Sequence, residues 1–420
     1  MVKFRISFPY FFVSALLFSG YQIGFKFIQL GIPDLALRVI GIQERVVNIS
    51  MGFMAIFSCI TAIIASIILD KYSPKPKIRF LMTLFLSGAQ ASLIALSLLI
   101  RTESQFLIWL GLFSALLGVI FPLVLSYVFL FIKSEDRGPI AGIITAFAYL
   151  FGNLSPNPWT IEGTLLDGII SSGPVMICIF YLIFHMELTE KFEPAENELE
   201  WFIGRYALKN DSEIQDTTKS RLFAPLDGNH SFLLILFLMF GVYFIDSFGF
   251  LRVIHQNELM QFTWHGLYEI KILLGVTHFV TAISMGFLYK KYGYWIVFLA
   301  SFALFFIADL LFSFYPMGIL LIITSMVYCS TVSFYTVNSF ALFADCSTKK
   351  DMYKRAGIGI GVGGWLSSFL STMLTVELFE MTSGVEGFRL HLLITSIIAA
   401  VFLILTIFTL YGKNNSKKST

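Results

Sequence analysis

Long apolar runs separated by short polar stretches alternate along the whole chain. Most of these runs approach the length of about 20 residues that a helix needs to cross about 30 Å of hydrocarbon. The pattern therefore predicts a chain that crosses a membrane many times. We expect twelve transmembrane spans at 8–31, 46–69, 80–100, 106–132, 140–154, 169–186, 232–251, 267–289, 294–314, 317–343, 356–376 and 390–410.

One polar stretch, 187–230, is much longer than the others and is rich in charged residues. It is too poor in apolar residues to fold by itself, so we interpret it as a cytoplasmic linker. The linker divides the chain into an N-terminal six-helix bundle, 1–186, and a C-terminal six-helix bundle, 231–420. Equal halves suggest an internal repeat. The predicted fold class is an all-α membrane protein with two six-helix bundles.

Composition supports lipid as the solvent of this chain. Hydrophobic residues make up 57% and charged residues only 13%, whereas soluble domains are about half apolar and about a quarter charged. The net charge of +2 provides no basic field for nucleic acid, which we exclude as a partner. The four cysteines lie in or beside apolar runs, so we expect packing residues rather than a disulfide framework.

The basic residues predict the orientation. Lys and Arg accumulate in the cytoplasmic loops of membrane proteins. With twelve spans and both termini in the cytoplasm, most of the 29 basic residues fall on the cytoplasmic side. The two densest loops follow the second and tenth spans and contain Lys71, Lys75, Lys77 and Arg79, and Lys349, Lys350, Lys354 and Arg355.

Short motifs recur at corresponding places in the two halves. The segment 69–77 after the second span reads LDKYSPKPK, and the segment 286–293 after the eighth reads GFLYKKYG. Both resemble the cytoplasmic G-x-x-x-D-R/K-x-G-R/K signature of the major facilitator superfamily. The third motif resembles the R-G-x-x-x-G of that superfamily and opens the fifth and eleventh spans with Arg137, Gly138 and Gly142, and with Arg355, Gly357 and Gly361.

The resemblance implies a transporter of two bundles that works by alternating access, with spans one, four, seven and ten around a central cavity. It also implies a conformational latch at Asp70, Lys71 and Arg137. The chain departs from the signature because serines replace its two glycines in the first copy and Lys290 replaces the acid in the second. The start of the first span and the loop 69–76 look similar to facilitators of large neutral amino acids and nucleobases.

Polar residues inside the first span predict part of the site. Gln22 and Lys26 share a helical face with Ser19 and Gln29. A Lys inside hydrocarbon costs about 3 kcal/mol on insertion scales, so it requires a wet cavity, a partner or both. We expect Lys26 to pair with Asp246 of the seventh span. The alternatives are a packed salt bridge without substrate contact, or snorkelling of Lys26 to the interface.

The second half provides the other candidate residues. Tyr243 lies on the face of Asp246, and Tyr335 and Asn338 lie on one polar face of the tenth span. Such side chains suit hydrogen bonds to a polar solute, although helix packing also explains them. His278 in the eighth span and Asp246 are the candidates for proton coupling. We discount Asp309 because its span, the ninth, is peripheral in the superfamily.

The sequence thus predicts a monomeric secondary or facilitative transporter of a small organic solute, with protons as a candidate second substrate. The expected substrate-binding residues are Gln22, Lys26, Tyr243, Asp246, Tyr335 and Asn338. No nucleotide, metal or hydrolase motif occurs, so we expect no cofactor, no metal and no enzyme. The alternative is a transporter-derived membrane scaffold or receptor that carries nothing.

Overall fold

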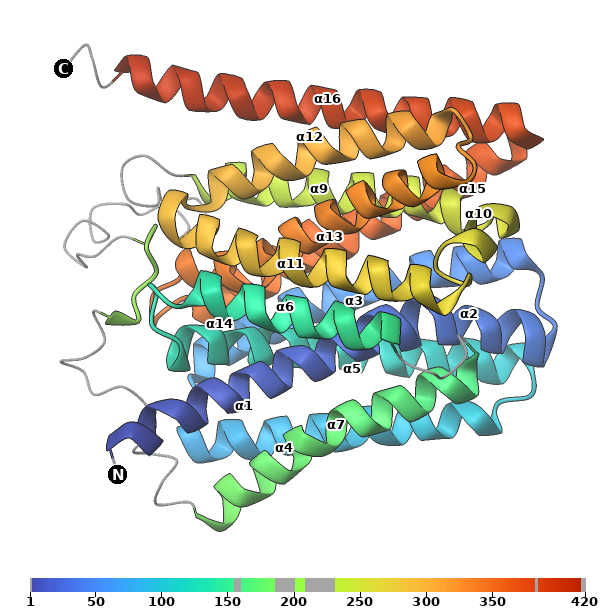
Figure 1. Cartoon of the computed structure of the whole chain (residues 1–420). Helices are drawn as coiled ribbons and strands as arrows, with labels where there is room; N and C mark the ends of the chain where they lie inside the picture. The colour runs from blue at the N-terminus through green and yellow to red at the C-terminus, as the bar shows by residue number, and fades with distance from the viewer. Residues whose placement is uncertain (1, 155–159, 186–200, 208–230, 382–383, 417–420) are drawn as a thin grey trace. The chain divides into compact units, whose positions relative to one another are not determined.

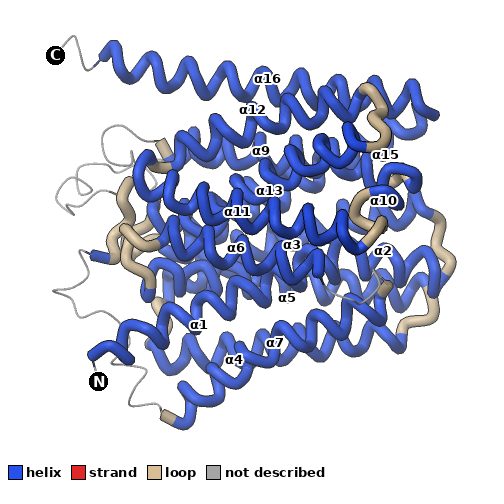
Figure 2. Tube along the Cα trace, viewed as in Figure 1, coloured by secondary structure: helices blue, strands red, loops and turns tan. Residues whose placement is uncertain are grey.

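The computed structural model describes residues 2–154, 160–185, 201–207, 231–381 and 384–416. All regular elements within these ranges are helices, and short loops or turns join them (Figure 2). Most of the linker predicted over 187–230 lies outside the described residues. The all-α prediction is confirmed for the part of the chain that the structure describes.

The chain divides into two compact units. The first contains 1–137, 155–209 and 340–365, and the second contains 138–154, 210–339 and 366–420. The helices that lie mainly in the first unit are α1 (Val2–Gln22), η1 (Ile23–Gly31), α2 (Ile32–Asp34), η2 (Leu35–Ile40), α3 (Glu44–Tyr72), α4 (Pro76–Leu96), η3 (Ser97–Leu99), α5 (Glu103–Phe131), α7 (Ile161–Phe184), α14 (Met352–Ile358) and η7 (Gly359–Leu366).

The helices that lie mainly in the second unit are α6 (Arg137–Leu154), α9 (Phe232–Ile254), α10 (Asn257–Phe262), α11 (Tyr268–Tyr292), α12 (Tyr294–Ser313), α13 (Ile319–Asp345), α15 (Ser367–Met381) and α16 (Gly384–Ser416). Within this unit α12 packs beside α16, and α15 packs beside α9 (Figure 1). Within the first unit α3 packs against α5 and α14, and α4 packs against α7.

Eleven helical stretches of the described residues are long and apolar enough to cross a membrane. The remaining predicted span is α6, whose 18 residues rise about 27 Å at 1.5 Å per residue. It begins at Arg137 and occupies the place of 140–154, the shortest of the predicted spans. The chain is an integral, multi-pass membrane protein, and α6 occupies the place of the remaining predicted span among the described residues.

Helix ends differ from the predicted spans at two informative places. The first helical stretch continues beyond residue 31 through η2 and stops at Gly41, whose φ of 81° favours glycine. The sixth starts earlier than predicted, because Thr160 accepts a hydrogen bond from the Gly163 amide and caps α7. This helix therefore includes Asp167, which the predicted span 169–186 left out.

Close glycine contacts explain why the compact units do not follow the halves of the sequence. A Cβ atom on Gly142 of α6 would lie 2.7 Å from the Ala282 carbonyl oxygen and 3.0 Å from Gly286 of α11. A Cβ atom on Gly357 of α14 would lie 2.4 Å from the Ser66 side chain of α3. Helices approach this closely only through small residues.

These contacts give the repeated motifs a structural meaning. Gly142 of α6 packs against Gly286, and Gly357 of α14 packs against Ser66. Gly286 and Ser66 stand where the loop signature has its first glycine. Contacts therefore group α6 with α11, and α14 with α3. The predicted bundles, 1–186 and 231–420, divide the chain by the order of its helices and not by their contacts. That division stays a prediction.

Candidate functional site

Lys26 lies inside the π-helical segment η1 and is almost completely buried, with 1% of its surface exposed. Its ammonium group forms an ion pair with the carboxylate of Asp167 on α7. The aromatic core of the first unit surrounds this segment, since Phe27 contacts Trp109 and Phe113 of α5. Asp167 thus provides the counter-ion that a buried ammonium requires.

The sequence analysis missed Asp167 because it placed this residue before the sixth span. An N-cap threonine seven residues earlier was the available signal. The π-helical segment also changes the predicted polar face, because its wider turn has more residues than an α-helical turn and so shifts the phase of the helix. Ser19, Gln22 and Lys26 are buried, whereas Gln29 is exposed.

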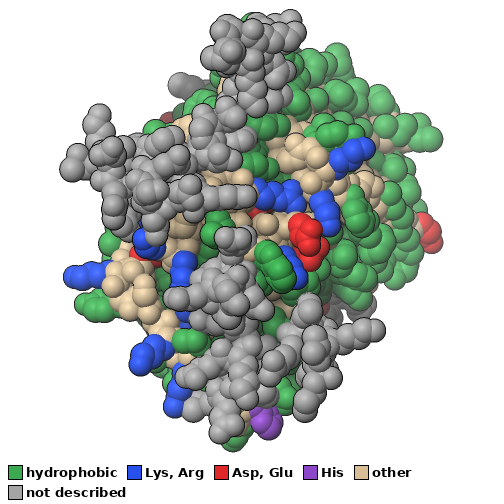
Figure 3. Space-filling view, turned by 90° about the vertical axis from the view of Figure 1, so that its left-hand side faces the viewer, with side chains coloured by type: hydrophobic (Ala, Val, Ile, Leu, Met, Phe, Trp, Pro, Cys, Tyr) green, Lys and Arg blue, Asp and Glu red, His purple; other side chains and the backbone are tan. Residues whose placement is uncertain are grey.

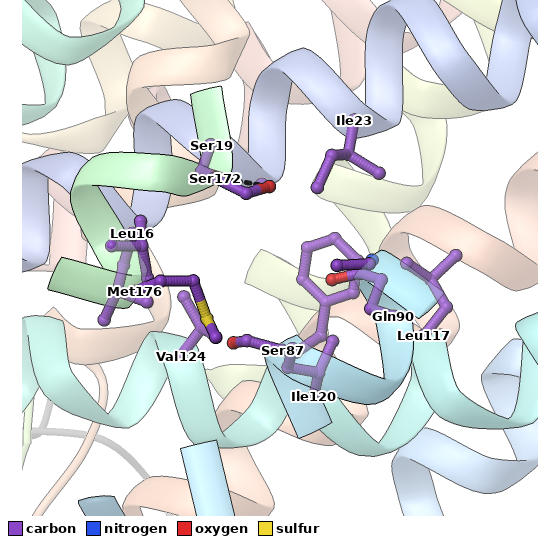
Figure 4. Close-up of a pocket in the computed structure, with 14 residues that line it drawn as sticks. Leu16, Ser19, Ile23, Ser87, Gln90, Leu117, Ile120, Val124, Ser172 and Met176 are labelled. Carbon is purple, nitrogen blue, oxygen red and sulfur yellow. Dashed lines mark hydrogen bonds between the residues drawn. The ribbon is translucent and has the colours of Figure 1, made fainter. Parts of the chain in front are cut away.

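A cavity lies among α1, α4, α5 and α7 of the first unit, one to two turns from the Lys26–Asp167 pair (Figure 4). Its polar lining residues are Ser19, Ser87, Gln90 and Ser172, and the hydroxyl oxygens of Ser19 and Ser172 are 3.4 Å apart. The other lining side chains are apolar, such as Leu117. Ser19 comes from the predicted polar face, but Gln22 and Lys26 are not among the lining residues.

Asp246 of α9 is the centre of a hydroxyl cluster in the second unit. Its carboxylate accepts hydrogen bonds from the hydroxyl of Tyr328 and, at 2.6 Å, from that of Tyr335. Tyr243 packs its ring edge-on against Tyr335 and donates to the Ser339 hydroxyl at 2.8 Å. Both tyrosine partners of Asp246 are 6% exposed, whereas Asp246 and Tyr243 keep an intermediate exposure.

Three predicted residues of the second half, Tyr243, Asp246 and Tyr335, therefore lie together with Tyr328 of α13. Asn338 is completely buried one turn beyond Tyr335. Neither its Oδ1 nor its Nδ2 atom has a hydrogen-bond partner among the described residues. A buried amide of this kind can still bond a water molecule or a ligand.

The predicted pair of Lys26 and Asp246 would connect residues of different units, and it stays a prediction. Each residue has a partner within its own unit, Asp167 for Lys26 and the two tyrosines for Asp246. Lys26 consequently does not depend on Asp246 for charge neutrality.

His278 of α11 belongs to a separate polar contact in the second unit. Its Nδ1 atom is 2.8 Å from the Ser333 hydroxyl, and its ring stacks on Tyr149 of α6 with centroids 4.1 Å apart. The Tyr149 hydroxyl lies 3.2 Å from that of Thr336. These contacts fix the imidazole in a packed position. Among the described residues, no group of three or more His, Cys, Asp or Glu side chains could hold a metal ion.

Asp70 belongs to the first loop signature and caps another helix. Its carboxylate accepts hydrogen bonds from the backbone amides of Tyr353 at 3.2 Å and Lys354 at 2.9 Å, in the first turn of α14. A carboxylate is stabilised there by the unpaired amides and the positive end of the helix. Lys71 is exposed and lies over the ring of Tyr72.

Arg137 forms a completely buried ion pair with Asp345, with nitrogen and oxygen 2.8 Å apart. Its guanidinium also donates to the carbonyl oxygens of Phe129, Ile132 and Phe202. Phe202 belongs to 201–207, the one described part of the predicted linker. The amide of Tyr206 in this segment donates to the Asp345 carbonyl at 2.9 Å. Arg137 thus joins the α5–α6 loop, the linker and the end of α13.

Comparison with known proteins gives structural but no sequence relatives. No protein-family model matches the sequence, and no curated protein matches it. Solved structures do match: each alignment described below covers 96% of this chain and 99% of the other. The human organic anion transporter MFSD10 (TETRAN) superposes with a TM-score of 0.60 at 14% identity.

Two further transporters show the same likeness. The nucleoside transporter NupG superposes with a TM-score of 0.53 at 13% identity. The E. coli fucose:proton symporter FucP, a Major Facilitator Superfamily transporter, superposes in its outward conformation with a TM-score of 0.58 at 15% identity. Together with the helices and motifs above, these superpositions show that the chain has the major facilitator fold.

Proposed function

We propose that this protein carries a small organic solute across a membrane by alternating access. The observation that carries the proposal is the presence of charged and hydrogen-bonding side chains inside the transmembrane helices of each unit. Lys26 with Asp167 is one such group, and Asp246 with Tyr328 and Tyr335 is the other. Charged groups in hydrocarbon are costly and by default indicate a functional site.

The structural neighbours support the same class of activity. Their printed descriptions name an organic anion, a nucleoside and fucose with protons. All three are small polar or charged solutes. We therefore infer a polar organic substrate that requires hydrogen bonds and charge neutralisation in the membrane.

In this proposal each unit contributes its own side chains to the solute. In the first unit Lys26 and Gln22 contact the solute. A carboxylate or hydroxyl of the solute replaces Asp167 as the partner of Lys26. In the second unit, Asp246 and Tyr243 retain accessible surface. Tyr335 orients the Asp246 carboxylate, and the unsatisfied amide of Asn338 supplies a further donor and acceptor.

We propose that Asp70, Lys71 and Arg137 stabilise one conformer on the cytoplasmic side. Asp70 holds the start of α14, and Arg137 holds Asp345 and the linker, so both contacts must change when these helices move. We also propose that both termini are cytoplasmic and that the protein acts as a monomer. Figure 3 shows Lys and Arg side chains on the face that would then lie in the cytoplasm.

Uptake by purified protein in liposomes tests the proposal. The radiolabelled panel contains amino acids, nucleosides and nucleobases, sugars and organic acids, each with and without an inward proton gradient. We expect saturable uptake of at least one class above protein-free liposomes, and its loss in the Lys26→Ala and Asp246→Ala variants. Lys77→Ala, an exposed lysine outside the proposed site, is the matched control and should transport normally.

The same assay separates a carrier from a scaffold or receptor. A scaffold would show no uptake of any class although the protein is folded and correctly inserted. If both alanine variants transport at the wild-type rate, the site assignment is wrong even though the carrier proposal stands.

A further inference from the structure

Asp309 is a buried acid that the sequence analysis set aside. It lies on α12 and is 1% exposed. Phe305 and Phe312 lie one turn before and one turn after it on the same helical face. Both rings contact Tyr328 of α13, with centroids 6.1 and 6.3 Å away. Asp309 therefore faces the tyrosine that donates a hydrogen bond to Asp246.

Asp309 also lies against the helix that carries Asp246. Its Oδ1 atom is 3.0 Å from the position that a Cβ atom would occupy on Gly249 of α9. Gly249 follows Asp246 by one helical turn. Glycine at this place leaves room for the Asp309 carboxylate beside the turn of α9 that follows Asp246.

The surroundings of the two acids contain hydroxyls but no ion-pair partner. Neither Asp246 nor Asp309 forms an ion pair with any residue that the structure describes, and the Oδ2 atom of Asp309 has no hydrogen-bond partner there. Titratable or charged groups of the packed helices include Tyr243 and Arg252 on α9, Tyr328, Cys329 and Tyr335 on α13, His278 on α11, Tyr149 on α6 and His391 on α16.

The nearest of these groups are already engaged. His391 contacts the Phe248 carbonyl through Nε2 at 2.8 Å, and Tyr328 and Tyr335 donate to Asp246. Two neighbouring carboxylates without a cation cannot both be ionised at low cost in a nonpolar interior. A bound proton reduces the charge of the pair from −2 to −1 and gives the unpaired Asp309 oxygen a bond.

We propose that Asp246 and Asp309 form a proton-binding carboxyl pair in which the partly exposed Asp246 is the entry and the buried Asp309 is the store. In the transfer, the O–H bond on Asp246 breaks and an O–H bond forms on Asp309 Oδ2, so the charge of the pair is unchanged. Asp246 then becomes the anion that the two tyrosine hydroxyls stabilise. This inference rests on the proposed function and makes the proton the second substrate of the carrier.

Infrared difference spectroscopy of the purified protein in nanodiscs tests the pair without any transport. At pH 7 in Na⁺-free buffer, we expect a protonated-carboxyl C=O band in the wild type. Asp309→Asn should abolish the band, and Asp246→Asn should shift its frequency because the anionic neighbour is gone. Asp309→Glu should keep a band, which shows that the variant site is folded, and the exposed Glu386→Gln should leave the spectrum unchanged.

Three results would overturn the inference: no band in the wild type, a band that survives Asp309→Asn, or a band that Asp246→Asn leaves in place and unshifted. A wild-type band that Na⁺ removes would identify a metal-cation site instead. Spectra as expected without uptake of any solute would refute the proposed function but not the carboxyl pair. Uptake without the expected band would refute the carboxyl pair but not the proposed function.

Discussion

At the scale of single residues, the environment of Lys26 shows how a membrane helix keeps a charge. The ammonium is buried to 1% exposure and is neutralised by a carboxylate from another helix of the same unit. Removing one member of such a pair leaves an uncompensated charge, whereas removing both leaves only polar or apolar groups. The two residues should therefore be strongly coupled.

A double-mutant cycle measures this coupling. Lys26→Met and Asp167→Asn should each lower the free energy of unfolding by about 3 kcal/mol, and the double variant should lose much less than their sum. Denaturant unfolding in mixed micelles provides the values. Arg38→Met is the matched control, because its guanidinium is 49% exposed and surface pairs contribute about 1 kcal/mol or less. Additive losses at Lys26 and Asp167 would contradict the pairing.

Several residues of the candidate site could be predicted from the sequence and others could not. The helical period places Tyr243 with Asp246, and Tyr335 with Asn338, because residues on one helix share a face at fixed spacing. The period does not say which neighbouring helix a face meets. Asp167 was missed because the predicted span began after it, and Asp309 was set aside because its span was expected to be peripheral. Each becomes significant only through a partner on another helix.

At the scale of helices, small residues decide which elements pack together. The glycines that open α6 and α14 are required there, because an added Cβ atom would lie 2.7–2.8 Å from backbone oxygens of α11 and α3. The sequence predicted these motifs and their repetition. It did not predict the grouping of α6 with the second unit, because spacing along the chain contains no information on contact partners.

Gly142→Ala should weaken the contact between α6 and α11. Its methyl group would lie 2.7 Å from the Ala282 carbonyl oxygen, so we expect a loss of about 1–3 kcal/mol in the free energy of unfolding. Gly111→Ala in α5 is the control, because no heavy atom lies within 4 Å of the added methyl group. The control should be neutral or slightly stabilising in a helix. Equal effects of the two substitutions would refute the close-packing explanation.

The docked linker segment 201–207 offers a second test at this scale. A Cβ atom on Gly204 would lie 2.3 Å from the Asp345 carbonyl oxygen, so Gly204→Ala should displace the segment. Trypsin should then cleave after Arg205 about tenfold faster than in the wild type, since cleavage follows the population of the open form. Mass spectrometry of the released peptides gives the rate at this bond.

Gly173→Ala of α7 is the control for the proteolysis, because nothing lies within 4 Å of its added methyl group. Cleavage at the wild-type rate in the Gly204 variant would show that the segment is not held by Asp345. Faster cleavage in both variants would indicate general destabilisation instead.

At the scale of the whole molecule, apolar length and basic loops predicted the membrane class, the number of spans and the fold. These properties follow from the lipid solvent, which acts on every span alike. The fifth span tested the prediction most severely, and α6 occupies its place. The orientation rests on charge alone, so it requires its own measurement.

Cysteine labelling in intact cells measures the orientation. Lys77→Cys and Arg101→Cys place thiols at opposite ends of the stretch Pro76–Leu99, which is long enough to cross the membrane. A membrane-impermeant maleimide should label the second in intact cells and the first only after permeabilisation. The four native cysteines are buried, and burial raises the pKa of the Cys346 thiol, so background labelling should be low. The reverse pattern would place both termini outside.

Alternating access is the central claim, and counterflow tests it most directly. Vesicles that contain the purified protein are loaded with an excess of an unlabelled transported solute and diluted into a trace of the labelled form. The account predicts transient accumulation of label above equilibrium, because each site that returns inward carries external solute. Simple equilibration at the rate of unloaded vesicles, as through an open pore, would contradict it.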